Sequence, residues 1–367
     1  MSAPPFLHGA APPGRLVTAD DRTTADEAYG LACQGVALLW RGDFQSARQL
    51  LIALARRADR HSGRQRSRAA AALASAADFH RYRQGRAQRA RTLSMLLVPL
   101  EEDYRLTLPR APDVREACLE AYGPADGPRL IPLRALLGLI GAHEWRRRGI
   151  EFPAVGGRIH PHYGVFAPVR SEYVDLVSSA PLPPASALHS VAVDVGTGTG
   201  VLAAVLARRG LGRVVATDQD PRALACAREN IGRLGLADHV QVIQADLFPA
   251  ETAALVVCNP PWLPARPTSA LEHAIYDPDS RMLRGFVEGL AAHLFPGGEG
   301  WLILSDLAEH LGLRSREELL ALFDAAALQV LGRQDLRPMH PRSKDAADPL
   351  HAARAAEVTS LWRLGAR

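Results

Sequence analysis

The chain has 367 residues, 47% of them hydrophobic and 22% charged, which is ordinary for a soluble globular protein with room for two domains. The net charge is +4, and arginine carries nearly all of the positive charge because Lys344 is the only lysine. No apolar run is long enough to span a membrane, and the first residues lack the pattern of a signal peptide. We therefore expect a cytoplasmic protein without a membrane partner.

The four cysteines are scattered along the chain and form no paired spacing. His160 and His162 have no acid or cysteine at the spacing of metal ligands. We therefore expect neither a metal site nor a disulfide framework.

The first 150 residues are expected to be helical. Residues 1–22 contain Pro, Gly and Ala without periodicity and are expected to be poorly ordered. Apolar residues then recur at helical spacing, which predicts an all-helical N-terminal domain over residues 23–150. Ala28–Leu39 fits one helix, and a second helix begins after Gly42, so the pair resembles a tetratricopeptide hairpin. Further helices are expected over Arg68–Tyr82, Ala87–Tyr104 and Pro132–Arg147.

Arginine is concentrated in one stretch of this region. Between Arg41 and Arg91 there are thirteen arginines and three acidic residues. One interpretation is a surface that contacts the phosphates of RNA or DNA. The other is a solvated face of arginine-rich helices that pair in part with carboxylates elsewhere. The sequence leaves both interpretations open.

The second half of the chain has a different pattern. Residues 151–188 are expected to form a hairpin or linker around a Gly-Gly pair. Over residues 189–367, strand-like and helix-like runs alternate, which predicts an α/β, Rossmann-like domain with a mainly parallel, seven-stranded sheet. The strand-like runs are VAVDV, RVVATD, VQVIQAD, ALVVCN, GWLILS, Leu328–Gln334 and Glu357–Leu364.

A glycine-rich turn follows the first of these strands. The strand ends at Asp194-Val195 and continues into Gly196-Thr197-Gly198-Thr199-Gly200. Glycine lets the backbone approach a ligand closely, and the start of the next helix favours a carboxylate. The next two strands end at Asp218 and Asp246, whose carboxylates can accept hydrogen bonds from ribose hydroxyls and an adenine amino group. Together these residues predict a nucleoside pocket.

The order and spacing of these motifs resemble class I S-adenosylmethionine (SAM)-dependent methyltransferases over about the C-terminal half of the chain. VDVGTGTG is similar to the first motif of that family, Asp218 to its ribose carboxylate and Asp246 to its adenine-contacting acid. The resemblance implies SAM as the cofactor. The cofactor-binding residues that we expect are Asp194, Gly196, Thr197, Gly198, Gly200, Asp218, Gln219, Asp246, Leu247 and Asn259.

The fourth strand continues into Asn259-Pro260-Pro261-Trp262. This run resembles the Asn/Asp-Pro-Pro-aromatic motif of N-methyltransferases that act on planar nitrogen. The side-chain oxygen of Asn259 and the carbonyl of Pro260 can accept the two N–H bonds of an amide or exocyclic amine, which holds the nitrogen toward the methyl group. Trp262 offers a flat surface for a planar substrate. We predict that Asn259, Pro260 and Trp262 are catalytic and that Pro261, Trp262 and Tyr276 bind the substrate.

Two groups of enzymes share this motif. The glutamine N5-methyltransferases of release factors and ribosomal proteins resemble this chain in residues 166–177 and 275–286, whereas the adenine-N6 and guanine-N2 methyltransferases fit the arginine-rich stretch. The expected substrate is thus a protein glutamine or a nucleobase. A small molecule of biosynthesis is an alternative, and the sequence specifies no oligomeric state.

Two further classes of function agree less well with the sequence. A nicotinamide-dependent oxidoreductase is opposed by the GxGxG spacing and by the Asn-Pro-Pro-Trp motif. A non-catalytic RNA- or protein-binding module is opposed by the intact strand-end residues Asp194, Asp218, Asp246 and Asn259.

Overall fold

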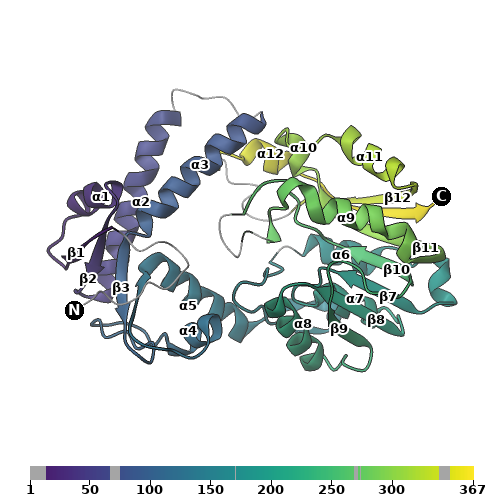
Figure 1. The fold of residues 1–367 in the computed structure, drawn as a ribbon, viewed down its shortest axis with the longest axis horizontal. Coiled ribbons are helices and arrows are strands. Elements are labelled where there is room, and N and C mark those ends of the chain that lie inside the picture. Colours follow the sequence, from purple (N-terminus) through teal and green to yellow (C-terminus); the bar gives the residue numbers. More distant parts are fainter. Residues whose placement is uncertain (1–13, 67–74, 170, 268–271, 273, 339–347) are drawn as a thin grey trace. The chain divides into compact units, whose positions relative to one another are not determined.

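The computed structural model describes residues 14–66, 75–169, 171–267, 272, 274–338 and 348–367. The chain divides into two compact units (Figure 1). The first ends at Glu144, and the second runs from Trp145 to Arg367 and also includes Ser75–Asp78 among the described residues. Over the described residues, no helix combines the length and the apolar character that crossing a bilayer requires.

The first unit contains a four-stranded sheet in the order β1-β2-β3-β4. The first three strands are parallel, and β4 is antiparallel to β3. Helices connect the strands, as expected for parallel neighbours. The elements are β1 (Arg15–Ala19), α1 (Ala25–Cys33), β2 (Val36–Trp40), α2 (Phe44–Arg66), α3 (Ala76–Leu93), β3 (Leu96–Leu100), α4 (Arg115–Tyr122), β4 (Arg129–Pro132) and α5 (Leu133–Arg148).

The expectation of an all-helical N-terminal domain is therefore wrong, and so is the tetratricopeptide-like hairpin. The expected helix over Ala28–Leu39 is interrupted. α1 ends at Cys33, and Gly35 then adopts a φ of +77°. Val36–Trp40 then forms β2, and all five residues are buried between β1 and β3. A strand that is buried on both faces is apolar without alternation, so periodicity does not distinguish it from a buried helix.

Two other expectations for this unit also differ from the structure. The helix expected over Ala87–Tyr104 contains the end of α3 and then β3. Residues 1–22, expected to be poorly ordered, contain β1, although residues 1–13 lie outside the described part. Part of the helix expected over Arg68–Tyr82 also lies outside it. The expected helix over Pro132–Arg147 is confirmed as α5, with Pro132 directly before it.

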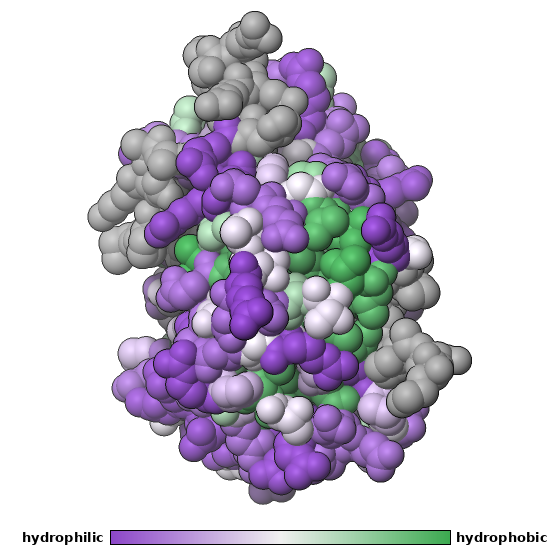
Figure 2. Space-filling view, turned by 90° about the vertical axis from the view of Figure 1, so that its left-hand side faces the viewer, coloured by the Kyte–Doolittle hydropathy of each residue, from purple (hydrophilic) through white to green (hydrophobic). Residues whose placement is uncertain are grey.

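Some arginines of the arginine-rich stretch pair with carboxylates of the same unit. The Nε atom of Arg57 lies 2.7 Å from Oδ1 of Asp26, and Nε of Arg89 lies 2.7 Å from Oδ1 of Asp59. Figure 2 shows the side of the molecule where β1 and α1 lie in Figure 1, and most of this surface is hydrophilic, with apolar areas between the hydrophilic residues. The two ion pairs favour the interpretation as a solvated face, and nucleic-acid binding stays a prediction.

The second unit contains the predicted seven-stranded sheet, in the order β12-β13-β11-β10-β7-β8-β9. Five neighbouring strands are parallel, and β13 is antiparallel to both β11 and β12. The expected Rossmann-like domain is confirmed. The strands are β7 (Val191–Val195), β8 (Arg213–Asp218), β9 (Val240–Gln244), β10 (Ala253–Cys258), β11 (Leu294–Ser305), β12 (Leu328–Leu336) and β13 (Thr359–Ala366).

Helices cover both faces of this sheet (Figure 1). Alternate residues of one strand point to opposite faces, so Ala192 joins one apolar cluster and Val193 the other. The first cluster contains α6 (Glu172–Ser179), α7 (Val201–Arg208) and residues of α8 (Pro221–Arg233), and the second contains α9 (Arg281–Leu290) and α11 (Arg316–Ala325). The other helices are α10 (Leu307–His310), α12 (His351–Ala356) and the 3-10 turns η1 (Pro153–Val155), η2 (Pro184–Ala187), η4 (Pro278–Ser280) and η5 (Ala291–His293).

The segment expected as a hairpin or linker packs onto this sheet domain. β5 (Ile150–Phe152) and β6 (Gly157–Ile159) form an antiparallel hairpin. Phe152 and Ile159 of the hairpin are buried in the first apolar cluster together with Tyr173 of α6. The hairpin and α6 therefore contribute side chains to the core of the second unit.

Candidate functional site

Four neighbouring strands of the second unit end at one edge of the sheet, and the predicted site residues follow those ends. Because β7, β8, β9 and β10 are parallel, their carboxyl ends share this edge. The register pairs Asp194 with Val257 and Val195 with Cys258. The glycine-rich turn and the turn that begins at Asn259 therefore start at the same level of adjacent strands.

The three glycines of the turn have positive φ but differ in the space around them. The φ angles of Gly196, Gly198 and Gly200 are 71°, 55° and 81°. A Cβ atom on Gly196 would collide with the methyl group of Met282, and one on Gly200 would lie 3.2 Å from the Cα atom of Ala227. A Cβ atom on Gly198 would meet no atom within 4 Å. Gly198 therefore leaves open space in which a ligand can approach the backbone.

Asp194 stabilises the glycine-rich turn through two hydrogen bonds to its carboxyl group. Its Oδ2 atom accepts a hydrogen bond from the hydroxyl of Thr197 at 2.6 Å and one from the backbone N–H of Ala203 at 3.0 Å. The residue is 1% exposed. Burial raises the pKa of Asp194 to about 6, although both hydrogen bonds oppose this change.

This raised pKa makes stability depend on pH. The folded protein holds the Asp194 proton up to about pH 6, whereas an unperturbed aspartate releases it near 3.8. The stabilisation that the raised pKa of Asp194 contributes to the free energy of unfolding is thus fully present below pH 3.8, and it is lost as the pH rises through 6. We expect Asp194→Asn, whose amide oxygen can accept both hydrogen bonds, to gain about 2–3 kcal/mol relative to the wild type between pH 4 and pH 7. Urea unfolding at a series of pH values measures this difference, and a difference independent of pH would contradict the assignment.

Asp218 connects the second strand end to the glycine-rich turn. Its Oδ2 atom accepts a hydrogen bond from the backbone N–H of Gly198 at 3.0 Å, and its Oδ1 atom accepts one from Asp220. Burial raises the pKa of Asp218. The neighbouring Gln219 uses its backbone carbonyl to accept a hydrogen bond from Gln244 of β9. The structure therefore brings Asp218 and Gly198 into direct contact, as a shared cofactor site requires.

Asp246 and Leu247 lie after the third strand. Leu247 has a positive φ of 72°, and the hydroxyl of Thr217 donates a 2.5 Å hydrogen bond to its carbonyl. The carboxylate of Asp246 accepts a hydrogen bond from Nη2 of Arg281 at 2.7 Å. The side chains of Asp246 and Arg281 are 56% and 63% exposed, so this ion pair contributes little to stability. An adenine amino group at Asp246 would share the carboxylate with Arg281.

The Asn259-Pro260-Pro261-Trp262 corner is held by a hydrogen bond within it. The indole Nε1–H of Trp262 donates to Oδ1 of Asn259 at 2.9 Å. The ring of Trp262 is half-buried and packs against both apolar clusters of the sheet domain, while Pro260 is buried. An amide oxygen has two acceptor positions, so Oδ1 of Asn259 keeps one for a substrate.

The backbone that follows the Asn259 corner folds back and pairs with Leu263 directly after the corner. Leu263 and Tyr276 form a parallel bridge, and the backbone N–H of Asp277 donates to the carbonyl of Leu263 at 2.9 Å. The buried carboxylate of Asp277 then accepts hydrogen bonds from the backbone N–H groups of Met282 and Leu283 at the start of α9. Tyr276 is thereby placed beside the corner, although residues 268–271 and 273 lie outside the described part.

Sequence reasoning missed four residues of this site. Met282 packs on Gly196, Arg281 pairs with Asp246, Asp277 accepts hydrogen bonds from the start of α9, and Asn230 donates a hydrogen bond to the carbonyl of Thr199. The position of Asn230 on the apolar face of a helix could have indicated its role from the sequence. No sequence pattern identifies the contacts of Met282 with Gly196 and of Arg281 with Asp246. Within the described part of the chain, no group of three His, Cys, Asp or Glu side chains could hold a metal ion.

The strand order, the glycine-rich turn and the strand-end carboxylates are those expected of a class I SAM-dependent methyltransferase domain. Residues 157–327 match the family model described as the methyltransferase small domain. The resemblance inferred from the sequence motifs is confirmed for this part of the chain, and residues before Gly157 lie outside the match.

Relatives of known name match parts of the chain. A release factor glutamine methyltransferase of Cereibacter sphaeroides is 32% identical over 173 residues, which cover 43% of this chain and 58% of the relative. A ribosomal protein L11 methyltransferase of Pelotomaculum thermopropionicum is 53% identical over 68 residues, or 18% of this chain and 22% of the relative. The chain thus spans less than two thirds of the length of these relatives. Among solved structures, a geranyl diphosphate methyltransferase bound to GPP and sinefungin is similar with a TM-score of 0.40 and 15% identity, covering 53% of this chain and 77% of that one.

Proposed function

We propose that this protein transfers a methyl group from SAM to a planar nitrogen, and that this nitrogen is the side-chain amide of a glutamine in a protein. The main support for the proposal is that the Asn259 corner begins at the same level of the sheet as the glycine-rich turn, on the adjacent strand. The relative from Cereibacter sphaeroides, which is named a release factor glutamine methyltransferase, supports the choice of glutamine.

The residues at the sheet edge fit SAM. Gly198 has open space where a Cβ atom would stand, so a nucleoside or amino-acid group can approach the turn. The half-buried carboxylate of Asp218 is placed to accept hydrogen bonds from ribose hydroxyls, and Leu247 offers an apolar contact to adenine. SAM, when bound, supplies a methyl group on a positively charged sulfur that needs no further activation.

The corner residues orient the nitrogen that receives the methyl group. An amide nitrogen is a poor nucleophile because its lone pair is delocalised into the carbonyl group. Oδ1 of Asn259 and the carbonyl of Pro260 accept the two N–H bonds, which directs the lone pair toward the methyl group and stabilises the positive charge that develops on nitrogen. The prolines limit the backbone movement of these acceptors. With SAM bound, formation of the nitrogen–carbon bond would break the carbon–sulfur bond and leave neutral S-adenosylhomocysteine, and the nitrogen would then release its proton to water.

Trp262 fixes the amide of Asn259 in the productive orientation, because its indole N–H donates to Oδ1. Trp262→Phe keeps an aromatic ring but removes this donor. We expect a decrease in kcat of about tenfold, with the affinity for S-adenosylhomocysteine unchanged, since one neutral hydrogen bond is worth about 1 kcal/mol. Steady-state kinetics and calorimetry measure the two quantities. A Trp262→Phe variant with the kcat of the wild type would show that the ring alone is required.

Labelled methyl transfer identifies the substrate class. The purified protein is incubated with methyl-labelled SAM and a fractionated bacterial lysate, before and after treatment with nuclease or protease. We expect the label in a protein fraction that resists nuclease. Acid hydrolysis of that fraction should release labelled methylamine, because an N-methyl amide of glutamine hydrolyses to glutamate and methylamine. Asn259→Ala protein serves as the control for non-enzymatic labelling.

The alternatives give different results in the same experiment. Label that is lost with nuclease and recovered in a nucleoside would replace glutamine with a nucleobase and give the arginine-rich helices a role. Label in a small molecule would indicate a biosynthetic enzyme. If no fraction is labelled although S-adenosylhomocysteine binds, the proposed methyl transfer is wrong.

A further inference from the structure

One fully buried amide links the glycine-rich turn to the segment that follows the β5–β6 hairpin. Asn230 lies in α8 and is 0% exposed. Its Nδ2 atom donates to the carbonyl of Thr199 at 3.0 Å and to the carbonyl of His160 at 3.3 Å. Its Oδ1 atom accepts from the backbone N–H of His160 at 2.8 Å. One side chain thus connects three segments of the chain.

The position of Asn230 is chemically unusual. Asparagine is a poor helix former, and an amide that loses its partners in the core is costly. An apolar residue would fill this position in α8 if packing were the only requirement. The amide group donates to two backbone carbonyls outside α8 and also lies 3.5 Å from Sγ of Cys226. The thiol of Cys226 is a second donor to the His160 carbonyl at 3.5 Å, whereas the Thr199 carbonyl accepts from Asn230 at 3.0 Å.

The same part of the turn also packs directly on α8. A Cβ atom on Gly200 would lie 3.2 Å from the Cα atom of Ala227, so the turn and the helix are in close contact there. The hydrogen bond from Asn230 fixes the carbonyl just before Gly200. Thr197, Gly198 and Asp218, which face the proposed cofactor, are connected to this point by the backbone and by the bond between Gly198 and Asp218.

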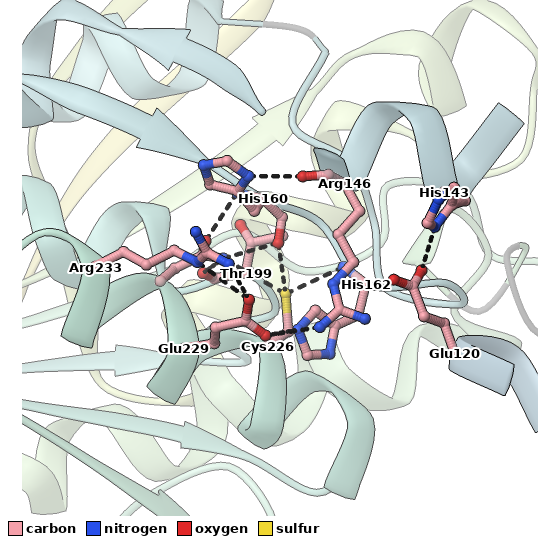
Figure 3. A network of polar contacts seen from close by, with 10 residues as sticks. Glu120, His143, Arg146, His160, His162, Thr199, Cys226, Glu229 and Arg233 are labelled. Atoms are coloured by element: carbon pink, nitrogen blue, oxygen red, sulfur yellow. Dashed lines mark hydrogen bonds and ion pairs between the residues drawn. The ribbon is translucent and has the colours of Figure 1, made fainter. Parts of the chain in front are cut away.

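The side chain of His160 makes a further polar contact, with the last turn of α5 (Figure 3). Its Nδ1 atom lies 2.6 Å from the carbonyl of Arg146, and the nearby His162 contacts Oε2 of Glu229 at 2.6 Å. Burial would raise the pKa of Glu229, but hydrogen bonds from Arg233 and His162 and the charge of Arg146 lower it to about 2. The hydrogen bonds behind Asn230 therefore extend to the last turn of α5.

We infer that Asn230 is a positioning residue for the cofactor: it sets the conformation of the glycine-rich turn by tying the Thr199 carbonyl to the anchored backbone of His160. This inference rests on the proposed SAM site. Without the amide, the turn loses this hydrogen bond to α8, although Gly200 still packs on the helix, so more of the turn must be ordered when the cofactor binds, which lowers affinity. We expect loss of the amide to affect cofactor binding, because the hydrogen bonds of Asn230 go to Thr199, His160 and Cys226 and not to the Asn259 corner.

Asn230→Asp is the sharpest test, because the side chain keeps its shape and its acceptor but turns its donor into an acceptor. A carboxylate would face the carbonyls of Thr199 and His160 and repel both. We expect the Kd for S-adenosylhomocysteine to rise at least tenfold at pH 8, with the KM for SAM rising in proportion and kcat changing less than threefold. At pH 6 a buried carboxyl group is protonated to a larger extent and can donate one hydrogen bond, so the ratio of variant to wild-type Kd should fall.

Glu229→Gln is the matched control. It lies one residue away in α8 and holds His162, Arg146 and Arg233, but it does not contact the turn. We expect this variant to melt at a lower temperature and to bind S-adenosylhomocysteine within twofold of the wild type. Hydrogen exchange of the peptide that contains residues 196–200 should be faster in Asn230→Asp than in Glu229→Gln. Asn230→Ser, which carries no charge and keeps one donor, replaces Asn230→Asp if that variant does not fold.

The outcomes are distinct. If Asn230→Asp melts at a lower temperature but binds S-adenosylhomocysteine like the wild type at both pH values, Asn230 only stabilises the fold and the inference is wrong. If both variants lose affinity equally, the effect arises from general anchoring of α8, which also contradicts it. If the wild type itself does not bind S-adenosylhomocysteine, the proposed SAM site fails before Asn230 is considered.

Discussion

Replacing Asn259 with alanine is expected to lower kcat about a thousandfold while the Kd for S-adenosylhomocysteine stays within about threefold of the wild type. The side-chain oxygen of Asn259 is the acceptor that holds the substrate nitrogen and stabilises its developing positive charge. Removing one preorganised hydrogen-bonding group of this kind costs about 10²–10³ in rate. The glycine-rich turn lies on the adjacent strand and loses no contact, so cofactor binding should persist. Single-turnover transfer of labelled methyl, together with calorimetry, measures both quantities.

Asn259→Asp is the control for this prediction. The aspartate keeps an oxygen at the same place, which can accept from the indole N–H of Trp262 and from the substrate. We expect this variant to retain activity within about tenfold of the wild type. The proposed role of Asn259 is wrong if the alanine variant keeps more than a tenth of the wild-type kcat, or if alanine and aspartate are equally inactive.

Replacing Gly198 with valine is expected to abolish cofactor binding, with the Kd for S-adenosylhomocysteine rising more than a hundredfold. Gly198 has a φ of 55°, which a β-branched residue adopts only with strain. The space where the new side chain would stand is open in the structure, and it is the space that we assign to the cofactor. A ligand that binds only the folded protein raises Tm, so the increase in Tm with S-adenosylhomocysteine should disappear.

Gly235→Val separates blockage of the site from backbone strain. Gly235 has a φ of 66°, and a Cβ atom there would also meet nothing within 4 Å, but the residue follows α8, away from the carboxyl edge of the sheet. Valine at this position should lower Tm through the same strain and leave the increase with S-adenosylhomocysteine intact. Equal loss of that increase in both variants would show that strain, not occupancy of the cofactor space, removes binding.

The two halves of the chain differ in how far the sequence predicted them. In the second unit, strands and helices alternate, and the glycine-rich turn and the Asn259 corner each follow a strand end within a few residues. In the first unit, Val36–Trp40 and Leu96–Leu100 are buried apolar runs of five residues, and their neighbours β1 and β4 decide that they are strands. Periodicity within one short run carries no information on such neighbours.

Local patterns in the sequence specify the sheet domain, the carboxyl edge that carries the site and the residues at the ends of β7, β8, β9 and β10. The contacts that shape this edge depend instead on how distant segments pack in the fold. Asn230 reaches Thr199 across 31 residues and His160 across 70, and Arg281 reaches Asp246 across 35. The physical reason is that these hydrogen bonds form only once packing of the helices on the sheet has brought distant segments together and excluded water from between them.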